Sequence, residues 1–318
     1  MKILKYAGII IVGALLAISV ANGNPGATES IQFRQSGAGA SVSIKDFGAR
    51  CDGVSDDTVA IQAAITAVGI NGGTLTAPPA VCMFSSLTIT SRISLIAYGT
   101  VFKKTADATG ISIASGAGSG TVLAGFTLDA ASILGSADGI SVGDVDNTNG
   151  AGSVVLRDLL ILHQNGNGVN VKNGNVGLIE NITALANGGH GILLDSKQIS
   201  VSNVNAWTIL RVAAVGNNKD GLHIGVSSSD VVTGFNSEGN GGYGLYVNYP
   251  YSTIMGYVEG NAAGPAYLGE SAFNCFIILR SVSGAITGAG SGSNFLYLQN
   301  GDGTAPSISP DGTLRVHQ

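Results

Sequence analysis

Hydrophobic and polar residues alternate in six short segments of one form through the middle of the chain. Each segment is a glycine followed by an apolar residue, a variable residue and a second apolar residue. Alternation of period two predicts a β-strand. The segments are Gly110–Ile113, Gly139–Val142, Gly168–Val171, Gly191–Leu194, Gly221–Ile224 and Gly244–Val247, with glycines 29, 29, 23, 30 and 23 residues apart. A near-fixed spacing in this range predicts a β-solenoid whose coils cover one another's apolar faces.

The alternation divides each segment between an inner and an outer face. The first apolar position predicts an inner column of Ile111, Ile140, Val169, Ile192, Leu222 and Leu245. The variable position predicts an outward column of Ser112, Ser141, Asn170, Leu193, His223 and Tyr246. An amide side chain also stands four residues before several of the glycines, at Gln164, Asn187, Asn217 and Asn240. Because stacked strands lie about 4.8 Å apart, we expect these amides to form a stabilising ladder along a turn.

A helical pattern precedes the coils. Ile61, Ala64, Ile65 and Val68 share one helical face, and Asp56 or Asp57 is suited to the N-cap. A short amphipathic helix here predicts a cap for the open end of the solenoid. The longer gaps between segments place extra residues near 130–137, 143–153 and 195–207. We expect these to be loops that wall a groove on the solenoid surface.

Composition fits a β-solenoid, and the N-terminus adds a targeting segment. The 318 residues include 48 glycines, 45% hydrophobic residues and 11% charged residues, which excludes a disordered chain. Lys2 and Lys5 flank the start of an apolar run at residues 7–20, which predicts a signal peptide cleaved after Ala21 or an uncleaved anchor. Cleavage takes the formal net charge from −5 to −7, which argues against nucleic acid or an anionic membrane as a partner. We expect a secreted, periplasmic or cell-surface protein.

The sequence divides into three parts. We predict a signal peptide at 1–21, a linker at 22–40 and one parallel β-helix domain at 41–318. Within the domain, the cap occupies 41–70, the coils about 72–282 and the closing strands 283–318. In an exported protein Cys51 and Cys82 either form a disulfide or remain two buried thiols, and Cys275 is expected in the core.

The segment before the coils resembles a known family. The run Asp46–Ile65 reads DFGARCDGVSDDTVAIQAAI and is followed by Gly72-Gly73-Thr74-Leu75 and Pro78-Pro79. Over residues 42–100 the chain resembles the pectate-lyase superfamily, which includes polygalacturonase-like and rhamnogalacturonase-like hydrolases, mannuronan epimerases and phage tailspike depolymerases. The resemblance implies an all-β, single-stranded right-handed parallel β-helix with a short N-terminal capping α-helix. The resemblance does not identify a catalytic residue, because in that group this motif forms the end cap and the first coil. We therefore expect Asp52, Asp56 and Asp57 to be structural.

Two glutamates are candidates for catalysis. Glu238 and Glu259 each precede a Gly-Asn pair, 21 residues apart, so we expect them side by side on adjacent coils. Two carboxylates that close raise the pKa of one of them, as acid catalysis of glycosidic cleavage requires. The alternative is a solvated edge without function. His223, on the outward column, is the third catalytic candidate.

Substrate-binding candidates surround His223. Tyr246 lies on the next coil, and Asn170 lies two coils earlier on the same column, so that a sugar ring would fit beside them. Asp195 opens the longest insertion, which also contains Lys197 and the single tryptophan, Trp207. Trp207 is predicted either as a sugar platform or as a plug beneath its loop.

Several apparent motifs carry less weight. Gly189-His190-Gly191 and Asn218-Lys219-Asp220-Gly221 resemble motifs of polygalacturonase-like hydrolases, but in reversed order and built from the repeat's own glycines. The Asp-Pro-His-Glu run of mannuronan epimerases is absent from the sequence. No cofactor and no metal ligand set is predicted; calcium is left open on the hint of Asp144 and Asp146 with Arg157.

Two functions remain open from the sequence. The first is an exported enzyme, a hydrolase or lyase, that acts on a polysaccharide in a groove on the β-helix face. The second is a non-catalytic β-helix that binds glycans or builds a surface structure. The only predicted partner is a polysaccharide, and we expect a monomer, with a trimer as the alternative.

Overall fold

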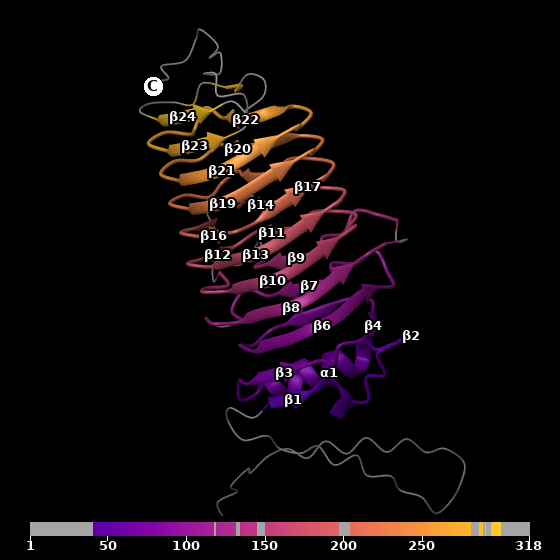
Figure 1. Ribbon diagram of the computed structural model, residues 1–318. Helices are drawn as coiled ribbons and strands as arrows, with labels where there is room; N and C mark the ends of the chain where they lie inside the picture. The colour runs from indigo at the N-terminus through magenta and orange to yellow at the C-terminus, as the bar shows by residue number, and fades with distance from the viewer. Residues whose placement is uncertain are drawn as a thin grey trace, which may run out of the picture. The chain divides into compact units, whose positions relative to one another are not determined.

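Parallel strands stack coil upon coil along the chain (Figure 1). The computed structural model describes residues 41–117, 119–131, 134–144, 150–196, 204–280, 286–288, 290 and 294–299, all within one unit. The predicted signal peptide, the linker and most of the predicted closing segment lie outside these residues, as do Asp146 and Lys197. No described helix combines the length and apolarity that a membrane span needs.

The strands form two long sheets and one short pair. The fourteen-stranded sheet contains β1 (Ser41–Ser43), β2 (Asp52–Asp56), β3 (Thr74–Thr76), β4 (Val81–Phe84), β6 (Ser94–Lys104), β8 (Val122–Asp129), β10 (Val155–Leu162), β13 (Leu178–Leu185), β16 (Thr208–Leu210), β17 (Ala213–Val215), β19 (Val231–Glu238), β21 (Thr253–Glu259), β23 (Phe276–Arg280) and β24 (Phe295–Gln299). The eight-stranded sheet contains β5 (Leu87–Ile89), β7 (Ile111–Ile113), β9 (Ile140–Val142), β11 (Val169–Val171), β14 (Ile192–Leu194), β18 (Leu222–Ile224), β20 (Tyr243–Val247) and β22 (Gly264–Leu268). β12 (Gly174–Asn175) pairs with β15 (Val204–Asn205).

The six segments of the sequence pattern supply β7, β9, β11, β14, β18 and β20 of the eight-stranded sheet. Their predicted inner column is fully buried, at 0% exposure for each residue from Ile111 to Leu245. The outward column is in register from Ser112 through His223 to Tyr246, and the pairing extends it to Tyr267 on β22. The fold is therefore the predicted parallel β-helix, with the apolar interior that the alternation required.

Amide side chains form the predicted ladder, which the structure extends by the half-buried Asn261. We call the whole row the inner ladder (Gln164, Asn187, Asn217, Asn240 and Asn261). Each asparagine side-chain oxygen accepts the backbone N–H of the amide residue on the preceding coil, at 2.9–3.1 Å. The side-chain nitrogens of Asn187, Asn217 and Asn240 donate to the next side-chain oxygen at 2.8–2.9 Å. The ladder thus satisfies polar backbone at a corner where the regular strand pairing stops.

The corners of the coils need left-handed backbone, and much of it comes from residues other than glycine. One column with positive φ precedes the strands of the fourteen-stranded sheet, at Ser153, Val176, Ala206, Ser229, Tyr251 and Asn274. A second lies at a bend within those strands, or between β16 and β17 in the case of Arg211, and comprises Gly99, Gly125, Asp158, Asn181, Arg211 and Gly234. A third precedes the inner ladder, at His163, Ala186, Gly216, Gly239 and Gly260. Each coil therefore turns at fixed positions whatever residue occupies them.

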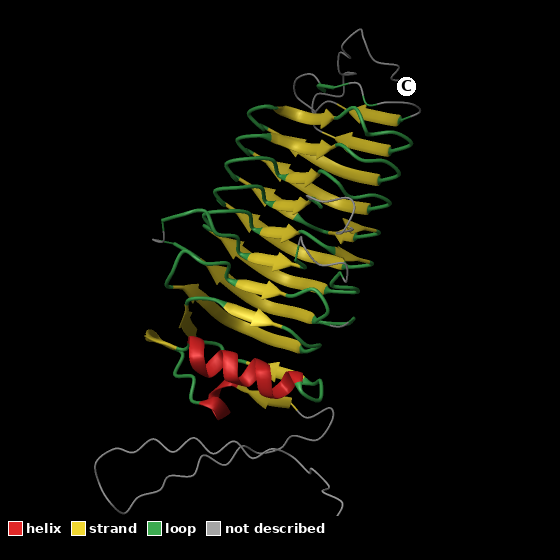
Figure 2. Cartoon of the chain, turned by 180° about the vertical axis from the view of Figure 1, so that it is seen from behind, coloured by secondary structure: helices red, strands yellow, loops and turns green. Residues whose placement is uncertain are grey.

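The N-terminal region is held by a helix and a disulfide. α1 (Thr58–Gly69) follows the short 3-10 helix η1 (Ile44–Phe47) and lies at the N-terminal end of the stack (Figure 2). It buries Ile61, Ala64, Ile65 and Val68, the face that the sequence predicted. Its role as an end cap stays a prediction.

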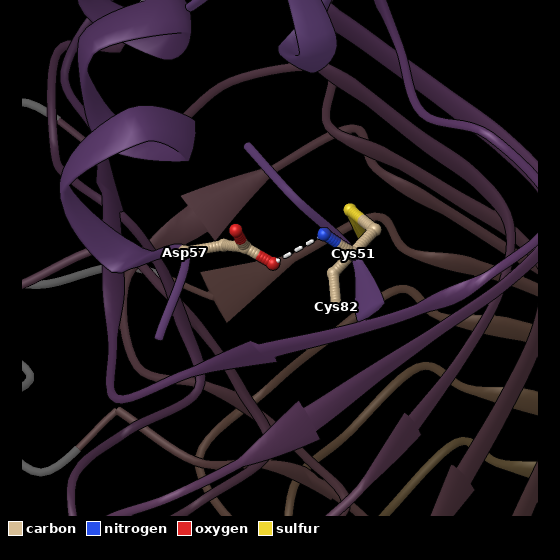
Figure 3. A group of neighbouring side chains, drawn as sticks. All are labelled: Cys51, Asp57 and Cys82. Carbon is tan, nitrogen blue, oxygen red and sulfur yellow. Dashed lines mark hydrogen bonds between the residues drawn. A yellow bond between two sulfur atoms is a disulfide. The ribbon is translucent and has the colours of Figure 1, made fainter. Parts of the chain in front are cut away.

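The cysteine alternatives are resolved in favour of pairing. Cys51 and Cys82 form a disulfide, and Asp57 beside it accepts the backbone N–H of Cys51 at 2.8 Å (Figure 3). Asp57 occupies the N-cap position of α1 without capping it, whereas Asp56 accepts the backbone N–H of Thr58 at 2.8 Å. These acids are therefore structural, as expected. Cys275 is a buried free thiol.

Candidate active site on the eight-stranded sheet

Two outward columns, one on the eight-stranded sheet and one at or just before the start of its strands, carry polar and aromatic side chains. One is the predicted column, which contains Asn170, His223 and Tyr246 and which the strand pairing extends to Tyr267. The other stands immediately before each glycine and contains Asp138, Asn167, His190, Asp220 and Tyr243. The inner neighbours of His223, Leu222 and Ile224, are fully buried, so the His223 side chain points out of the coil.

The second column forms a hydrogen-bonded row that we call the outer ladder (Asp138, Asn167, His190, Asp220 and Tyr243). In each step a side chain accepts the backbone N–H of the ladder residue on the next coil. The acceptors and donors are Asp138 Oδ1 from Asn167 (2.9 Å), Asn167 Oδ1 from His190 (2.8 Å), His190 Nδ1 from Asp220 (3.2 Å) and Asp220 Oδ1 from Tyr243 (2.7 Å). The backbone thereby fixes the side chains of His190 and Asp220.

Asp220 joins both histidines. Its Oδ2 lies 2.7 Å from Nδ1 of His223 and 3.2 Å from Nδ1 of His190. Burial raises the pKa of the Asp220 carboxyl, but the two histidines and the backbone N–H of Tyr243 outweigh it and hold the pKa well below its usual range. The ionised carboxylate accepts the Nδ1 proton of His223, so the neutral form of that ring has its lone pair on Nε2.

His190 is held by Asp220 at two points. Its Nδ1 lies 3.2 Å from the Asp220 backbone nitrogen and 3.2 Å from Oδ2. With its proton on Nε2 the ring accepts the backbone N–H, and with its proton on Nδ1 it donates to the carboxylate. Burial lowers the pKa of His190, although Asp220 acts in the opposite direction. The ring is therefore positioned by Asp220 in either tautomer.

Aromatic rings extend this cluster along the sheet. The His223 ring is tilted by 58° to the His190 ring at a centroid distance of 4.5 Å and lies parallel to the Tyr246 ring at 4.0 Å. Tyr246 in turn stacks on Tyr267 at 4.9 Å. Both faces of Tyr246 are thus covered, so it offers a substrate only its edge and hydroxyl. Burial, with smaller effects from Tyr267, Asp220 and Asp195, raises the pKa of Tyr246.

Asp195 and Asn170 lie on the same face in different settings. Asp195 Oδ1 accepts the backbone N–H of Val226 at 3.0 Å, and its carboxylate lies against Gly225, where an added Cβ would meet Asp195 Cγ at 2.6 Å. Asn170 is 7% exposed and donates to Asp138 Oδ2 at 2.7 Å. Asn170 therefore positions Asp138, and substrate contacts by Asn170 and Asp195 stay predictions.

Trp207 requires a correction. Its side chain is fully buried, and its indole N–H donates to the carbonyl of Gly174 at 2.8 Å. The prediction of a sugar platform is wrong because the ring is not exposed, and the alternative of a ring buried against the solenoid agrees with the structure. A bulky apolar ring gains more from burial than from exposure when its one polar atom finds an acceptor. Asp230, which accepts the Trp207 backbone N–H at 3.0 Å, is buried there too, and this burial raises its pKa to about 7.

The glutamate pair belongs to the other sheet. Glu238 and Glu259 are register partners on β19 and β21 of the fourteen-stranded sheet, as the spacing predicted. Glu238 accepts from Asn236 Nδ2 at 2.9 Å, and Glu259 accepts from the Tyr257 hydroxyl at 2.6 Å. The structure thus brings His223 and Tyr246 together and places the two glutamates on a different face.

His190 and Asp220 are the site residues that the sequence reasoning passed over. Both stand in motifs that were attributed to the repeat, and the repeat does create them. Their shared offset, one residue before the glycine on adjacent coils, was the available signal, because it places them beside each other and beside His223.

The cluster also bears on metal binding. Ligand atoms of His190, Asp220 and His223 lie within 4.8 Å of one another. Ligands of a tetrahedral ion at about 2.0 Å lie roughly 3.3 Å apart, whereas His223 Nδ1 and Asp220 Oδ2 are 2.7 Å apart. Hydrogen bonding describes this contact better than ligation does. Asp144, the described part of the calcium hint, accepts the backbone N–H of Ser115 at 3.0 Å, and Arg157 is on β10 of the other sheet.

Comparison with known proteins places the chain. No protein-family model matches it. Mannuronan C5-epimerase AlgE2 of Azotobacter vinelandii is 33% identical over 243 residues, which cover 67% of this chain and 24% of that protein. AlgE5 of the same organism matches to the same extent. The chain spans about a quarter of the length of these curated relatives.

Solved structures agree on the fold. The A-module of mannuronan C-5 epimerase AlgE4 from Azotobacter vinelandii matches with a TM-score of 0.57 and 19% identity, covering 87% of this chain and 100% of that one. The surface adhesin PfbA of Streptococcus pneumoniae matches with a TM-score of 0.51 and 12% identity, covering 84% and 94%. Fold and site define a right-handed parallel β-helix with titratable side chains on one outer face. The chain belongs to the pectate-lyase superfamily.

Proposed function

We propose that this protein is an exported polysaccharide-acting enzyme and that it cleaves a uronate-containing chain by β-elimination. The observation that carries the proposal is the contact between Asp220 and Nδ1 of His223, with the ring of Tyr246 stacked on the His223 ring; in the neutral ring this contact leaves the lone pair on Nε2. The relatives' names give mannuronan, a polymer of uronic acid, as what those enzymes act on, and C5 as the position. This supports a uronate polymer as the substrate here.

The cluster supplies the two groups that elimination needs. His223 Nε2 removes the C5 hydrogen, which the adjacent carboxyl group acidifies, and the released electron pair forms a C4=C5 double bond. The C4–O4 bond breaks as Tyr246 donates its phenolic proton to the departing oxygen. His223 then returns its proton to Tyr246 through solvent. The raised pKa of Tyr246 keeps the phenol protonated, as a proton donor must be.

The register of the two groups favours elimination over epimerisation. His223 and Tyr246 are partners on adjacent strands of one sheet face, so both reach a bound sugar from the same side. Epimerisation at C5 returns a proton to the opposite side of the ring. Elimination from one side suits sugars whose C5 hydrogen and C4 oxygen share a face, as in mannuronan and glucuronan. In polyguluronate and galacturonan these atoms lie on opposite faces.

Hydrolysis is the second candidate, because Glu238 and Glu259 are register partners. Glycoside hydrolysis uses two carboxyl groups that flank the scissile bond, about 5–9.5 Å apart. The pair would work on the fourteen-stranded sheet, away from the histidine cluster. The proposal that Asp195 and Asn170 contact the substrate belongs to the elimination site.

Export and partners follow from independent features. The predicted signal peptide supports export, and so does the Cys51–Cys82 disulfide, because disulfides persist in oxidising compartments. The proposed partner is a polysaccharide, and the proposed state is a monomer, which light scattering tests.

Purified protein incubated with mannuronan, glucuronan, polyguluronate, polygalacturonate and a neutral β-glucan tests the proposal. We expect the ultraviolet absorbance of an unsaturated uronic acid, first from mannuronan or glucuronan. His223→Gln is expected to lower turnover about 10²- to 10⁴-fold. Glu238→Gln and Glu259→Gln serve as matched controls and should keep wild-type turnover.

Three results would overturn the proposal. New reducing ends without unsaturation, lost in the glutamate variants, would establish hydrolysis. A changed C5 configuration without chain cleavage would establish epimerisation. Binding to a glycan with no product from any of the five would establish the non-catalytic alternative.

A further inference from the structure

The outer face of the fourteen-stranded sheet carries an exposed tyrosine with an unusual setting. We infer that Tyr98 is the platform of a second, non-catalytic glycan-binding site that holds a pyranose unit of the polysaccharide chain. The inference rests on the proposed function only for the class of ligand, since the site is on a different sheet from His223.

The Tyr98 ring lies flat on the sheet. An added Cβ at Gly125, on the next coil, would meet three atoms of the ring at 2.6–2.9 Å, so one face of the ring covers this glycine. The residue is nevertheless 56% exposed. Its hydroxyl donates to Asp158 Oδ2 at 2.7 Å. This hydrogen bond fixes the ring, and the side of the ring that faces solvent stays uncovered. A ring held in place loses little entropy when a sugar stacks on it.

Planar polar side chains continue the site along the bend of the coils. Asn181 Nδ2 donates to Asp158 Oδ1 at 2.7 Å, and Arg211 donates to Glu180 Oε1 at 2.6 Å. Asn181 and Arg211 are exposed. These carboxylates, amide and guanidinium are the groups that pair with the hydroxyls of a sugar.

The charges of the site balance. Asp158 and Glu180 are offset by Arg211 and by Arg157, which pairs in register with Glu180. A balanced site suits hydroxyl groups better than a densely charged polymer. We therefore expect it to accept a neutral glycan as well as a uronan, unlike the elimination site.

The eight-stranded sheet offers a direct contrast. Tyr246 and Tyr267 stack on each other there and expose their edges, whereas Tyr98 has a glycine beside it and exposes a face. An exposed aromatic face is what a pyranose stacks on, because the ring's C–H groups present an apolar surface.

The competing explanation is that Tyr98 only covers Gly125 and stabilises the sheet. Affinity and thermal stability separate the two. The experiment uses the full chain with His223→Gln, so that no ligand is consumed and catalysis cannot influence the result. Tyr98→Ala is compared with Tyr251→Ala, a matched control in which the tyrosine is 54% exposed but packs edge-on against Phe273.

Binding of mannuronan and of the neutral β-glucan is measured by calorimetry or affinity electrophoresis. We expect Tyr98→Ala to weaken binding of at least one of them about tenfold, Tyr98→Phe to weaken it by less, and Tyr251→Ala to leave it unchanged. Tyr98→Ala with wild-type affinity and a lowered melting temperature would show that the ring serves Gly125 alone and overturn the inference. Absence of wild-type binding to both glycans would overturn it as well. If the enzyme with His223 intact forms no elimination product while glycan binding still depends on Tyr98, the proposed function is refuted and this binding site remains supported.

Discussion

The His223 column on the eight-stranded sheet and Tyr98 on the fourteen-stranded sheet present aromatic side chains in opposite ways, although Phe276 and Phe295 of the fourteen-stranded sheet also stack on each other. On the eight-stranded sheet His223, Tyr246 and Tyr267 occupy one register column, and their rings stack face to face. On the fourteen-stranded sheet Tyr98 lies flat over Gly125 and leaves a face open. The strands are parallel in both sheets, but Tyr98 stands at a bend beside Gly99, which has positive φ, whereas His223 and Tyr246 lie on regular strands.

The residue on the next coil decides what an aromatic side chain shows to solvent. Rings about one strand spacing apart stack on each other and expose their edges. A ring beside a glycine has no such partner, and it folds down onto the backbone. Edges carry the hydroxyl and imidazole groups that move protons, whereas faces carry the apolar surface that holds a sugar. Under the two proposals, the stacked column would supply the chemistry and Tyr98 would hold the polysaccharide chain.

The largest expected effect separates the two faces outright. Asp220→Asn keeps an oxygen that accepts the Tyr243 backbone N–H, as Asn167 does for His190, but it removes the charge that orients His223. We expect turnover to fall at least about 10²-fold, while the melting temperature and glycan affinity at Tyr98 are retained. Turnover within a factor of two of the wild type would show that His223 acts without Asp220.

Two buried acids sharpen the contrast between paired and unpaired charge. The two histidines and the backbone N–H of Tyr243 lower the pKa of Asp220. At Asp230, just before β19, burial has the largest effect and raises the pKa from 3.8 to about 7. Between pH 3.8 and about pH 7, Asp230 is ionised in the unfolded chain but keeps its proton in the folded protein. Stability should therefore fall by about 4 kcal/mol as pH rises from about 4 to about 7.

Chemical denaturation across this pH range measures the effect. Asp230→Asn preserves an acceptor for the Trp207 backbone N–H and has no proton to release, so its stability should fall less steeply than that of the wild type. Parallel curves for the two proteins would mean that Asp230 is ionised in the fold at neutral pH.

A third test displaces the Tyr98 ring with a substitution at Gly125. Gly125→Ala combines a strained φ of +84° with a Cβ at 2.6 Å from the ring, so we expect a loss of about 1–3 kcal/mol in stability and weaker glycan binding. Gly116→Ala is the matched control, because Gly116 has a φ of +79° and no atom within 4 Å of an added Cβ. Equal effects of the two variants on binding would disconnect Tyr98 from the glycan.

The smallest effect concerns the outer ladder. His190→Asn retains a side-chain oxygen for the Asp220 backbone N–H, as Asn167 provides one step earlier, and we expect its unfolding free energy to stay near that of the wild type. His190→Ala removes this acceptor and should cost about 1 kcal/mol. Urea denaturation of both variants compares them, and a larger loss for asparagine would contradict the ladder.

Much of the fold was accessible from the sequence. The six glycine segments predicted the strands, the inner column and the outward column, and the amide spacing predicted the inner ladder. The left-handed corners were not accessible, because residues such as Val176 and Tyr251 occupy them without any glycine signal. Tertiary packing overrides local preference there.

The site was less accessible than the fold. His223 and Tyr246 could be paired because they share an offset on adjacent coils. His190 and Asp220 share a different offset, and their motifs could be explained by the repeat alone. Trp207 was left between two alternatives because an inserted loop carries no periodicity that tells a buried ring from an exposed one, and its burial excludes the sugar platform.

The sequence by itself determined the repeat, the face on which each strand residue lies and the neighbours it meets on the next coil. These follow from a period of two along the strand and a fixed strand spacing, both of which are local properties. Only the tertiary structure decided which rings expose edges and which expose faces, which carboxylates find partners, and which sheet each candidate joins. Those outcomes depend on contacts across coils and corners, where a single glycine or a buried backbone N–H decides how a side chain lies.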